Sequence, residues 1–290
     1  MRGILLSGGL GSRLFPLTIG NSKQLLPVYN KPMIYYSLSL LMLGGIKDIA
    51  IITNPDNILR YKQLLNQIEY LGLKFTFIKQ DKPDGIPQSF ILGEQFIGDS
   101  DIVLVLGDNM LHGPRLRERL TRMYSSPEGC SILGFEVQNP QDFGVAVIDI
   151  NGKVTELVEK PVDPPSNFAI PGLYKFPNCV VNKAKSLKKS VRNETEIIDL
   201  LKLYFNENKI SIDLLGRGYS WFDCGSIRSL NYASDFVRLT ESNYGFMIGS
   251  PEEIAINKKW VSSKQVLQKI QPLNSEYYQN LKRMINESTL

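Results

Sequence analysis

A glycine-rich loop follows the first apolar run of the chain. It contains Leu6, Gly8, Gly9, Gly11, Ser12 and Arg13. Glycines let backbone N–H groups approach a phosphate, and an arginine adds a charged fork for phosphate oxygens. A P-loop would need lysine where Ser12 stands, and a dinucleotide fingerprint would need glycine or alanine at Leu14. The loop alone therefore indicates either phosphate binding of another kind or a tight surface turn.

A second basic residue, Lys23, lies in the segment 22–27, which reads Ser-Lys-Gln-Leu-Leu-Pro. A lysine ten residues after Arg13 can close over the same phosphates from another loop. Taken alone, Lys23 is more typical of a solvated side chain before a proline turn. The two segments together are far more specific than either one, and they favour phosphate binding.

Two aspartates are candidate metal ligands. Asp108 comes just after the apolar run 102–106, and Asp223 follows Trp221-Phe222, an apolar lead-in that would direct it into a cleft. Carboxylates hold Mg²⁺ together with phosphate oxygens, since Mg²⁺ is a hard cation. The alternative is a turn or a helix cap at each aspartate. We expect the metal site.

Strand and helix signals alternate in the first half of the chain. Short apolar runs predict strands at 3–6, 49–53, 75–78 and 102–106, and longer patterns predict helices at 33–43, 58–68 and 89–96. Continuously apolar strands are typical of parallel sheets buried on both faces. We therefore expect an α/β fold with a doubly wound, mostly parallel, Rossmann-like sheet. Its ligands should lie outside the carboxyl ends of the strands, where the glycine loop and Asp108 fall.

The second half of the chain is predicted to form a smaller part of the molecule that is richer in β-strands. Residues 145–150 and 154–158 predict a hairpin around an Asn-Gly turn at 151–152, and another strand is expected within 166–176. Helices are expected at 197–205 and 229–239. After Gly249 the sequence predicts C-terminal helices.

Composition narrows the classes of protein. The chain has 290 residues, 43% hydrophobic and 21% charged, as in a folded globular protein. A net charge of +4 is too weak to indicate a nucleic-acid partner. Three separated cysteines and a single histidine argue against disulfide frameworks, zinc sites and a histidine-dependent triad. No apolar stretch is long enough for a membrane span, and the N-terminus lacks the features of a signal peptide. We expect a cytoplasmic protein with no membrane partner.

Motifs spread along residues 1–256 resemble those of the sugar-phosphate nucleotidylyltransferases, most closely the bacterial glucose-1-phosphate thymidylyltransferases. They are the glycine loop, segment 22–27, Lys31–Tyr36, Pro83–Gly85, Leu106–Asn109, Glu159–Pro161, Gly172–Tyr174, Trp221–Asp223 and Pro251–Ala255. The resemblance implies a core at 1–240, with a nucleotide part at about 1–128 and a sugar-binding part at about 129–240. A helical extension follows at 241–290.

The resemblance also implies the reaction and its residues. A sugar 1-phosphate would attack dTTP, releasing pyrophosphate, with Mg²⁺ held by Asp108 and Asp223. Arg13, Lys23 and Lys160 would stabilise charge. The nucleotide positions are Leu6, Gly8, Gly9, Gly11, Ser12, Gln24, Gln80, Pro83, Gly85 and Asp108. The sugar-phosphate positions are Gly144, Glu159, Lys160, Ile170, Tyr174 and Arg192. The alternatives are a UTP-dependent or amino-sugar enzyme of the same fold, or a non-catalytic nucleotide-sugar sensor.

Several departures from the family pattern gather on the sugar side. Phe143 replaces a tyrosine, and Pro171 replaces a small residue. Cys224 and Ser226 replace threonines, and Thr195 and Ile198 alter the stretch after Arg192. The base and the reaction are therefore better supported than the identity of the sugar.

The resemblance further implies a homotetramer with a second, regulatory nucleotide site. The matching positions are His112, Gly113, Arg217, Glu253 and Ile254, while Asn257 stands where an arginine is common. An amide binds phosphate more weakly than a guanidinium does. We expect the second site to be present but to bind its nucleotide more weakly. The alternative is that the C-terminal helices only pack subunits together. For His112, the alternative to nucleotide binding is a position at a subunit contact.

Overall fold

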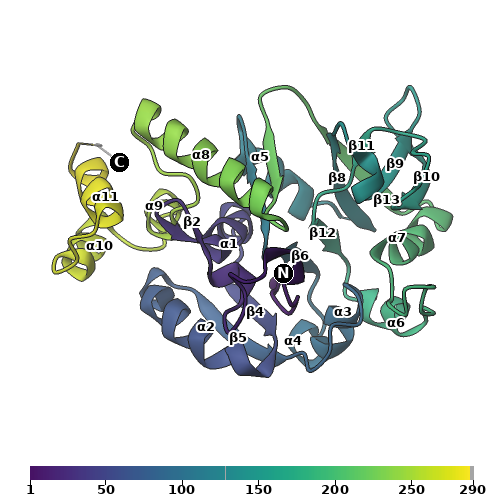
Figure 1. The fold of residues 1–290 in the computed structure, drawn as a ribbon, viewed down its shortest axis with the longest axis horizontal. Coiled ribbons are helices and arrows are strands. Elements are labelled where there is room, and N and C mark those ends of the chain that lie inside the picture. Colours follow the sequence, from purple (N-terminus) through teal and green to yellow (C-terminus); the bar gives the residue numbers. More distant parts are fainter. Residues whose placement is uncertain (128, 288–290) are drawn as a thin grey trace.

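The computed structural model describes residues 1–127 and 129–287. Predictions that reach residue 128 or residues 288–290, at the ends of the expected nucleotide part and helical extension, lie outside the described residues. One large sheet runs through the molecule (Figure 1). Its parallel half has the order β6–β1–β4–β5, with β1 at Arg2–Leu6, β4 at Asp48–Thr53, β5 at Lys74–Lys79 and β6 at Ile102–Leu106.

Helices cover both faces of this parallel half. Successive residues of β1 point to opposite faces, so Leu5 packs with one group of helices and Ile4 with the other. The first group is α1 (Met33–Leu43), α2 (Ile58–Leu65) and α5 (Leu116–Tyr124). The second is α3 (Gln88–Leu92), α4 (Glu94–Ile97), α6 (Val180–Lys185) and α7 (Ile197–Asn206). The predicted doubly wound α/β fold is confirmed.

The β-rich half continues the same sheet with antiparallel pairs. β12 (Leu173–Phe176) pairs with β6 and with β8 (Cys130–Glu136), and it joins the two halves. Beyond β8 lie β11 (Phe168–Ala169), β9 (Gly144–Ile148) and β10 (Val154–Glu159), while β13 (Ile210–Leu215) runs parallel to β8. The expected hairpin is present as β9–β10. Its connection spans 149–153, because the Asp149 carboxylate accepts from the backbone of Asn151 and Lys153.

A two-stranded ribbon lies next to the end of β6. It pairs β7 (Asn109–His112) with β14 (Ser220–Asp223), and its register places Asp223 opposite Asn109. Helix α8 (Ile227–Tyr244) follows, starting with a capping box in which Ser226 and Ser229 exchange hydrogen bonds. The ribbon thus brings two residues far apart in sequence to one edge of the sheet. A second small ribbon pairs β2 (Pro27–Val28) with β3 (Lys31–Pro32).

The C-terminal helices pack against the core on the side away from the β-rich half (Figure 1). They are α9 (Pro251–Asn257), α10 (Ser263–Ile270) and α11 (Glu276–Glu287). Buried Glu252 accepts a 2.6 Å hydrogen bond from Tyr277, which ties α9 to α11. Buried Lys31 pairs with Glu241 of α8 at 3.0 Å. The first contact holds the C-terminal helices together, and the second joins α8 to the β2–β3 ribbon of the core.

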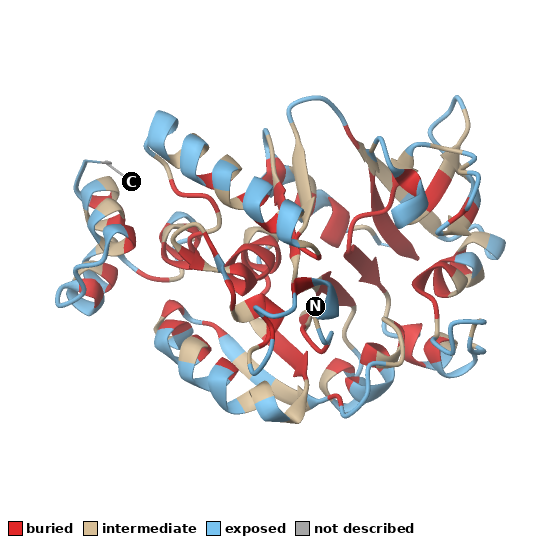
Figure 2. Cartoon of the chain, in the orientation of Figure 1, coloured by how far each residue is buried: buried red, intermediate tan, exposed pale blue. Residues whose placement is uncertain are grey.

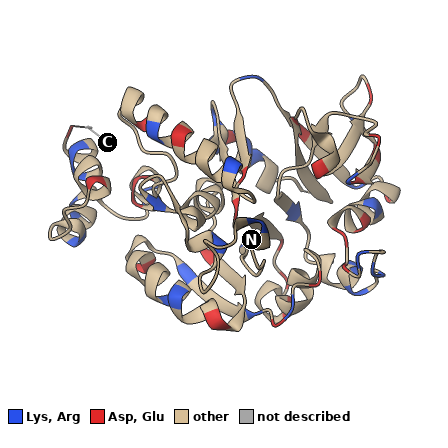
Figure 3. Cartoon of the chain, in the orientation of Figure 1, with Lys and Arg blue, Asp and Glu red and all other residues tan. Residues whose placement is uncertain are grey.

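Burial follows the same layers. Figure 2 shows buried residues on the central strands and on the inward faces of the helices, with exposed residues outside. Charges of both signs are mixed along the outer helices (Figure 3). None of the helices in the described ranges is both long and apolar enough to cross a membrane. Short 3₁₀ segments occur at Ser12–Leu14, Lys23–Leu25, Pro55–Asn57, Asn66–Leu71 and Pro140–Asp142.

Several predicted elements differ in their bounds. The helix expected at 89–96 is divided into α3 and α4 at Gly93, and the one expected at 58–68 changes to 3₁₀ at Asn66. The strand expected in 166–176 is two strands, β11 and β12. Helix α8 is longer than the predicted 229–239. The division at Gly93 follows from the low helix propensity of glycine.

Candidate active site

The glycine loop packs directly on the side chain of Gln80, the residue that follows β5. A side chain at Gly8 would collide with Gln80, so glycine is required for this close approach. Gly11 has φ 64°, a conformation that favours glycine, and its carbonyl accepts from the Thr18 hydroxyl at 2.8 Å. The loop then places Arg13 against Gly225, next to Asp223. The phosphate-binding candidates therefore meet the metal candidates in space.

Lys23 lies in the 3₁₀ segment after the glycine loop and forms an ion pair with Asp108. Both side chains are largely buried, with 10% and 14% exposed. Burial disfavours the charged forms, but the pairing prevails: it raises the pKa of Lys23 and lowers the pKa of Asp108. The Asn109 amide also donates to Asp108, at 3.2 Å. The charged pair is therefore stable in the absence of substrate.

Asp223 lies beside this pair. The Cys224 N–H donates to the Asp108 carbonyl at 3.0 Å, which fixes the end of β14 against the end of β6. Burial and the neighbouring Asp108 carboxylate raise the pKa of Asp223 to about 6. Two neighbouring carboxylates, one of which has its pKa raised by the other, have the chemistry of a site for a hard divalent cation, and these residues fit Mg²⁺. Within 1–127 and 129–287, no third carboxylate, histidine or cysteine joins them.

The two candidate base-reading glutamines, Gln24 and Gln80, are buried, and each is fixed by hydrogen bonds to neighbouring side chains. The Gln24 side-chain oxygen accepts from Ser22 at 2.8 Å and from Tyr61 at 3.3 Å. The Gln80 amide donates to Gln88 at 2.7 Å. Fixed amides of this kind can pair with a pyrimidine edge. Gly85, at φ 98°, brings the backbone close to the same region.

Two adjoining cavities contain most of the predicted site. One of about 230 Å³ is lined by the nucleotide-side residues Leu6, Gly9, Gln80, Pro83 and Gly85. The other, about 900 Å³, is lined by Arg13, Gly144, Ile170, Tyr174 and Asp223. Glu159, Lys160 and Arg192 line both cavities. Gly8, Gly11, Ser12, Lys23, Gln24 and Asp108 lie outside these two linings, in the loop and buried pair described above.

The sugar-side residues project from the end of the β9–β10 hairpin. Glu159 ends β10, and burial raises its pKa. Its Oε2 atom is buried and has no hydrogen-bond partner among the described residues, so it is available to a hydroxyl donor. Lys160 has the left-handed φ of 40°, with its N–H donating to the Phe143 carbonyl at 3.1 Å. A left-handed conformation is uncommon for a lysine, and the hydrogen bond to Phe143 helps to hold it.

Arg192 is held by two carboxylates. It pairs with Glu159 at 2.8 Å and with Glu196 at 2.7 Å. Glu196 was not among the predicted site residues, and because residues 192–196 are not helical, the four-residue spacing from Arg192 gave no signal of this ion pair. Asn109 is a second such residue. Its side-chain oxygen accepts from Trp221 at 2.8 Å and from the Gly172 N–H at 2.9 Å, and no sequence pattern shows this.

Two of the departures on the sugar side, Phe143 and Ile198, add apolar surface to the larger cavity. Phe143 packs on Trp221 with ring centroids 4.9 Å apart. Ile198 is fully buried, and a side chain at Gly144 would lie 2.7 Å from it, so this contact requires glycine. All three cysteines are free thiols, with Cys130 and Cys224 buried and Cys179 exposed.

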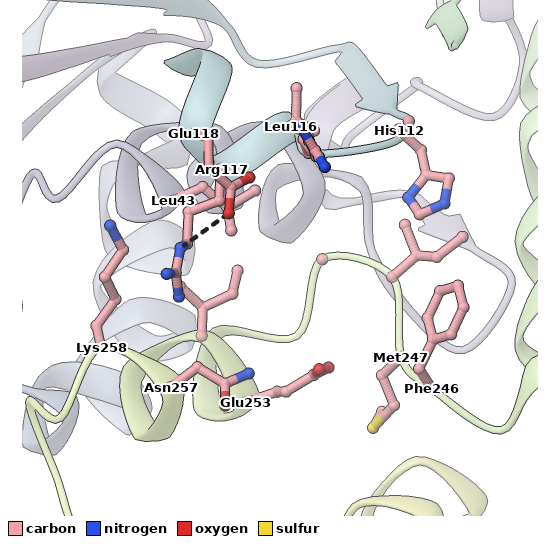
Figure 4. Close-up of a pocket in the computed structure, with 15 residues that line it drawn as sticks. Leu43, His112, Leu116, Arg117, Glu118, Phe246, Met247, Glu253, Asn257 and Lys258 are labelled. Atoms are coloured by element: carbon pink, nitrogen blue, oxygen red, sulfur yellow. Dashed lines mark ion pairs between the residues drawn. The ribbon is translucent and has the colours of Figure 1, made fainter. Parts of the chain in front are cut away.

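The predicted regulatory residues divide between two neighbouring cavities. His112, Gly113, Glu253 and Ile254 line one of about 420 Å³, shown in Figure 4. His112 stacks on Phe246 at one side of it, and burial lowers the pKa of His112. Arg217 lines a second cavity of about 640 Å³, and Arg115 and Glu118 line both. Asn257 lies in the first cavity, where a guanidinium would have added charge.

This fold and this cluster of buried carboxylates and basic side chains define an α/β enzyme class that handles phosphate groups. The family model described as Nucleotidyl transferase matches residues 2–239, and the chain belongs to this family. A glucose-1-phosphate thymidylyltransferase of Mycobacterium tuberculosis is 44% identical over 280 residues, 97% of each chain. One of Neisseria meningitidis is 41% identical over 288 residues, covering 99% of this chain and 100% of that protein.

Solved structures give the same fold. A crystal structure assigned to glucose-1-phosphate thymidylyltransferase from Bacillus anthracis, in complex with sucrose, has a TM-score of 0.76 and 36% identity, covering 82% of this chain and 95% of that one. A UDP-glucose pyrophosphorylase bound to UDP-glucose has a TM-score of 0.72 at 22% identity, covering 82% of this chain and 98% of that one. The second likeness shows the fold only.

Proposed function

We propose that this chain transfers a thymidylyl group from dTTP to glucose 1-phosphate, releasing pyrophosphate and forming dTDP-glucose. The observation that carries the proposal is the buried cluster of Lys23, Asp108 and Asp223, which lies beside two cavities that share Lys160. The curated relatives at 41–44% identity, named for this activity, support it.

The reaction needs positioning and charge neutralisation more than covalent chemistry. An oxygen of the sugar 1-phosphate attacks the α-phosphorus of dTTP in line, the bond to the β-phosphate oxygen breaks, and pyrophosphate leaves. The glycine loop would cradle the triphosphate, with Arg13 and Lys23 stabilising negative charge on it. Lys160 and Arg192 would hold the sugar phosphate, and Glu159 would accept from a sugar hydroxyl.

Asp108 and Asp223 are the residues that would hold Mg²⁺. When bound there, the cation would neutralise phosphate charge and help align the triphosphate. Lys23 already neutralises Asp108 in this structure. We infer that Lys23 is released toward phosphate oxygens when the nucleotide binds.

The decisive experiment measures pyrophosphate release over four nucleoside triphosphates and several sugar 1-phosphates. We expect the fastest release with dTTP and glucose 1-phosphate. Faster release with UTP or with an amino-sugar 1-phosphate would instead favour the first alternative. The absence of release with any pair, despite nucleotide-sugar binding, would favour a sensor.

The Gln80→Ala substitution tests pyrimidine recognition. Because Gln80 is buried and held by Gln88, its loss should weaken the use of dTTP and UTP together, lowering kcat/KM by about tenfold, the effect of one or two hydrogen bonds. Gln63→Ala, on the exposed side of α2, is the matched control and should change nothing. A preference of the unaltered protein for ATP or GTP would contradict this assignment.

We further propose a cytoplasmic homotetramer with a weakened regulatory site at the cavities lined by His112 and Arg217. Arg115 and Glu118 line both the cavity that contains His112 and the cavity that contains Arg217. One elongated anionic ligand could therefore extend from one cavity into the other. Sedimentation velocity should show a tetramer, and a monomer in that experiment would contradict the proposal.

Arg217→Ala tests the regulatory site. In the unaltered protein, a dTDP-sugar should inhibit non-competitively with dTTP. In the variant the inhibition constant should rise about tenfold, since a charge-assisted phosphate contact is lost. Arg238→Ala, on α8, serves as the control. If inhibition is competitive and equally strong in the unaltered protein and in both variants, the C-terminal helices serve only to pack subunits together.

A further inference from the structure

The two halves of the site are joined by contacts outside the chemistry described above. We call residues 80–85 the base loop and residues 189–196 the arginine turn. The Thr195 backbone N–H and hydroxyl both donate to the Asp84 carbonyl, at 3.1 and 2.8 Å. Gly85 and Thr195 form an isolated parallel bridge, and a side chain at Gly85 would collide with the Thr195 carbonyl. The base loop and the arginine turn are therefore in direct backbone contact.

Further contacts extend this connection into the base loop. The Lys189 ammonium pairs with the Asp84 carboxylate at 2.7 Å. The Asp84 N–H donates to the Gln88 side-chain oxygen at 3.1 Å, and that oxygen also accepts from Gln80 at 2.7 Å. The residue that holds the Asp84 backbone thus also holds a base-reading glutamine. A pyrimidine that fixes Gln80 and Gly85 would also restrict the position of Asp84.

At the other end, the arginine turn is held as a unit by the buried Glu196 carboxylate. It accepts from the Ser190 hydroxyl at 2.6 Å, from Arg192 Nε at 3.1 Å and from Arg192 Nη2 at 2.7 Å. Ser190 Oγ in turn accepts from the Arg192 N–H at 3.1 Å. Because Thr195 directly precedes Glu196, a displacement of Thr195 carries the carboxylate that aims the Arg192 guanidinium.

We propose that Thr195 is a positioning residue that couples pyrimidine binding at the base loop to sugar-phosphate binding at Arg192. The inference rests on the proposed function, because it assumes a base at Gln80 and a sugar phosphate at Arg192. Thr195 itself lies in the wall of the smaller cavity, and the role proposed for it is to connect the two segments rather than to recognise either ligand. A base that fixes Asp84 favours the arrangement of the turn in which Arg192 faces the shared cavity. By linkage, the sugar phosphate tightens base binding by the same factor.

The test measures glucose 1-phosphate binding by ³¹P NMR titration, with and without saturating thymidine. Thymidine carries the base without phosphates, so coupling by direct contact between phosphates is removed. In the unaltered chain, thymidine should tighten glucose 1-phosphate by at least about fivefold, the lower end of typical coupling between sites. In Thr195→Val, which loses the hydroxyl donor, the factor should fall below about twofold. Thr195→Ser should restore it.

Thr155→Val, on the exposed surface of β10, is the matched control and should keep the full factor. The proposal is overturned if thymidine leaves the affinity of the unaltered chain unchanged, or if Thr195→Val keeps the factor. It is also overturned if Thr195→Val weakens glucose 1-phosphate equally with and without thymidine, which would be a purely structural effect. Pyrophosphate release by the unaltered chain is measured first. Release without coupling refutes this inference alone, whereas no release refutes the proposed function.

Discussion

Asp223→Asn should lower turnover by at least about 10³-fold with little change in the fold, comparable to the loss of a main electrostatic group in an active site. The substitution keeps the size of the side chain but removes one of two carboxylates facing each other at the ends of β6 and β14. A cation held by both would lose half of its protein charge. Steady-state pyrophosphate release with limiting Mg²⁺ measures the effect, and Asp108→Asn should behave alike.

Direct metal binding gives a second readout for the same variants. Mn²⁺ titration followed by electron paramagnetic resonance should show a weakened site in both. In the unaltered chain, Mn²⁺ affinity should fall as the pH drops through about 6, because the raised pKa of Asp223 leaves it protonated below that value. Asp163→Asn, in an exposed loop, is the control. Full activity of Asp223→Asn at limiting Mg²⁺ would remove both aspartates from the metal role.

Lys23→Met should lose turnover by orders of magnitude and also lose about 3 kcal/mol of stability at pH 8 without Mg²⁺. Breaking a buried ion pair leaves a buried charge without compensation, at a cost of roughly 3–5 kcal/mol. Here the cost falls mainly on Asp108, which would lose its ion-pair partner, while Asp223 would lose one neighbouring cation and keep Arg13. Urea unfolding followed by circular dichroism measures the loss.

The contribution of Asp108 to the pH dependence of stability should change sign in this variant, whereas that of Asp223, whose pKa is already raised in the unaltered chain, should keep its sign. In the unaltered chain, Lys23 holds the pKa of Asp108 below its ordinary value, so that carboxylate stabilises the fold above its unfolded pKa and the contribution is lost as the pH falls. Without Lys23, burial raises the pKa of both carboxylates, so the folded state becomes more stable as the pH falls. Mg²⁺ should restore part of the loss at pH 8. Lys74→Met, at an exposed position, is the control, and stability equal to it would contradict the buried-pair account.

The local pattern of the sequence was sufficient for most of the fold. Helix α1 coincides with the predicted 33–43, and the runs 49–53 and 102–106 fall on β4 and β6. These segments are strongly apolar over their whole length, so burial and local preference favour the same structure. The glycine loop and Asp108 could likewise be placed at the carboxyl ends of strands, because parallel sheets collect those ends at one edge.

The sequence by itself was therefore sufficient for the class of fold and for nominating the glycine loop and the other candidate site residues. Tertiary structure alone decided which of them meet. Asp108 and Asp223 become neighbours only through the register of β7 and β14, and Arg192 gains Glu159 as a partner only through the position of the arginine turn. Likewise, no pattern within residues 189–196 shows that Thr195 binds the Asp84 carbonyl. The contacts of Arg192 with Glu159 and of Thr195 with Asp84 join residues 33 and 111 positions apart, and they depend on packing geometry that short-range periodicity does not record.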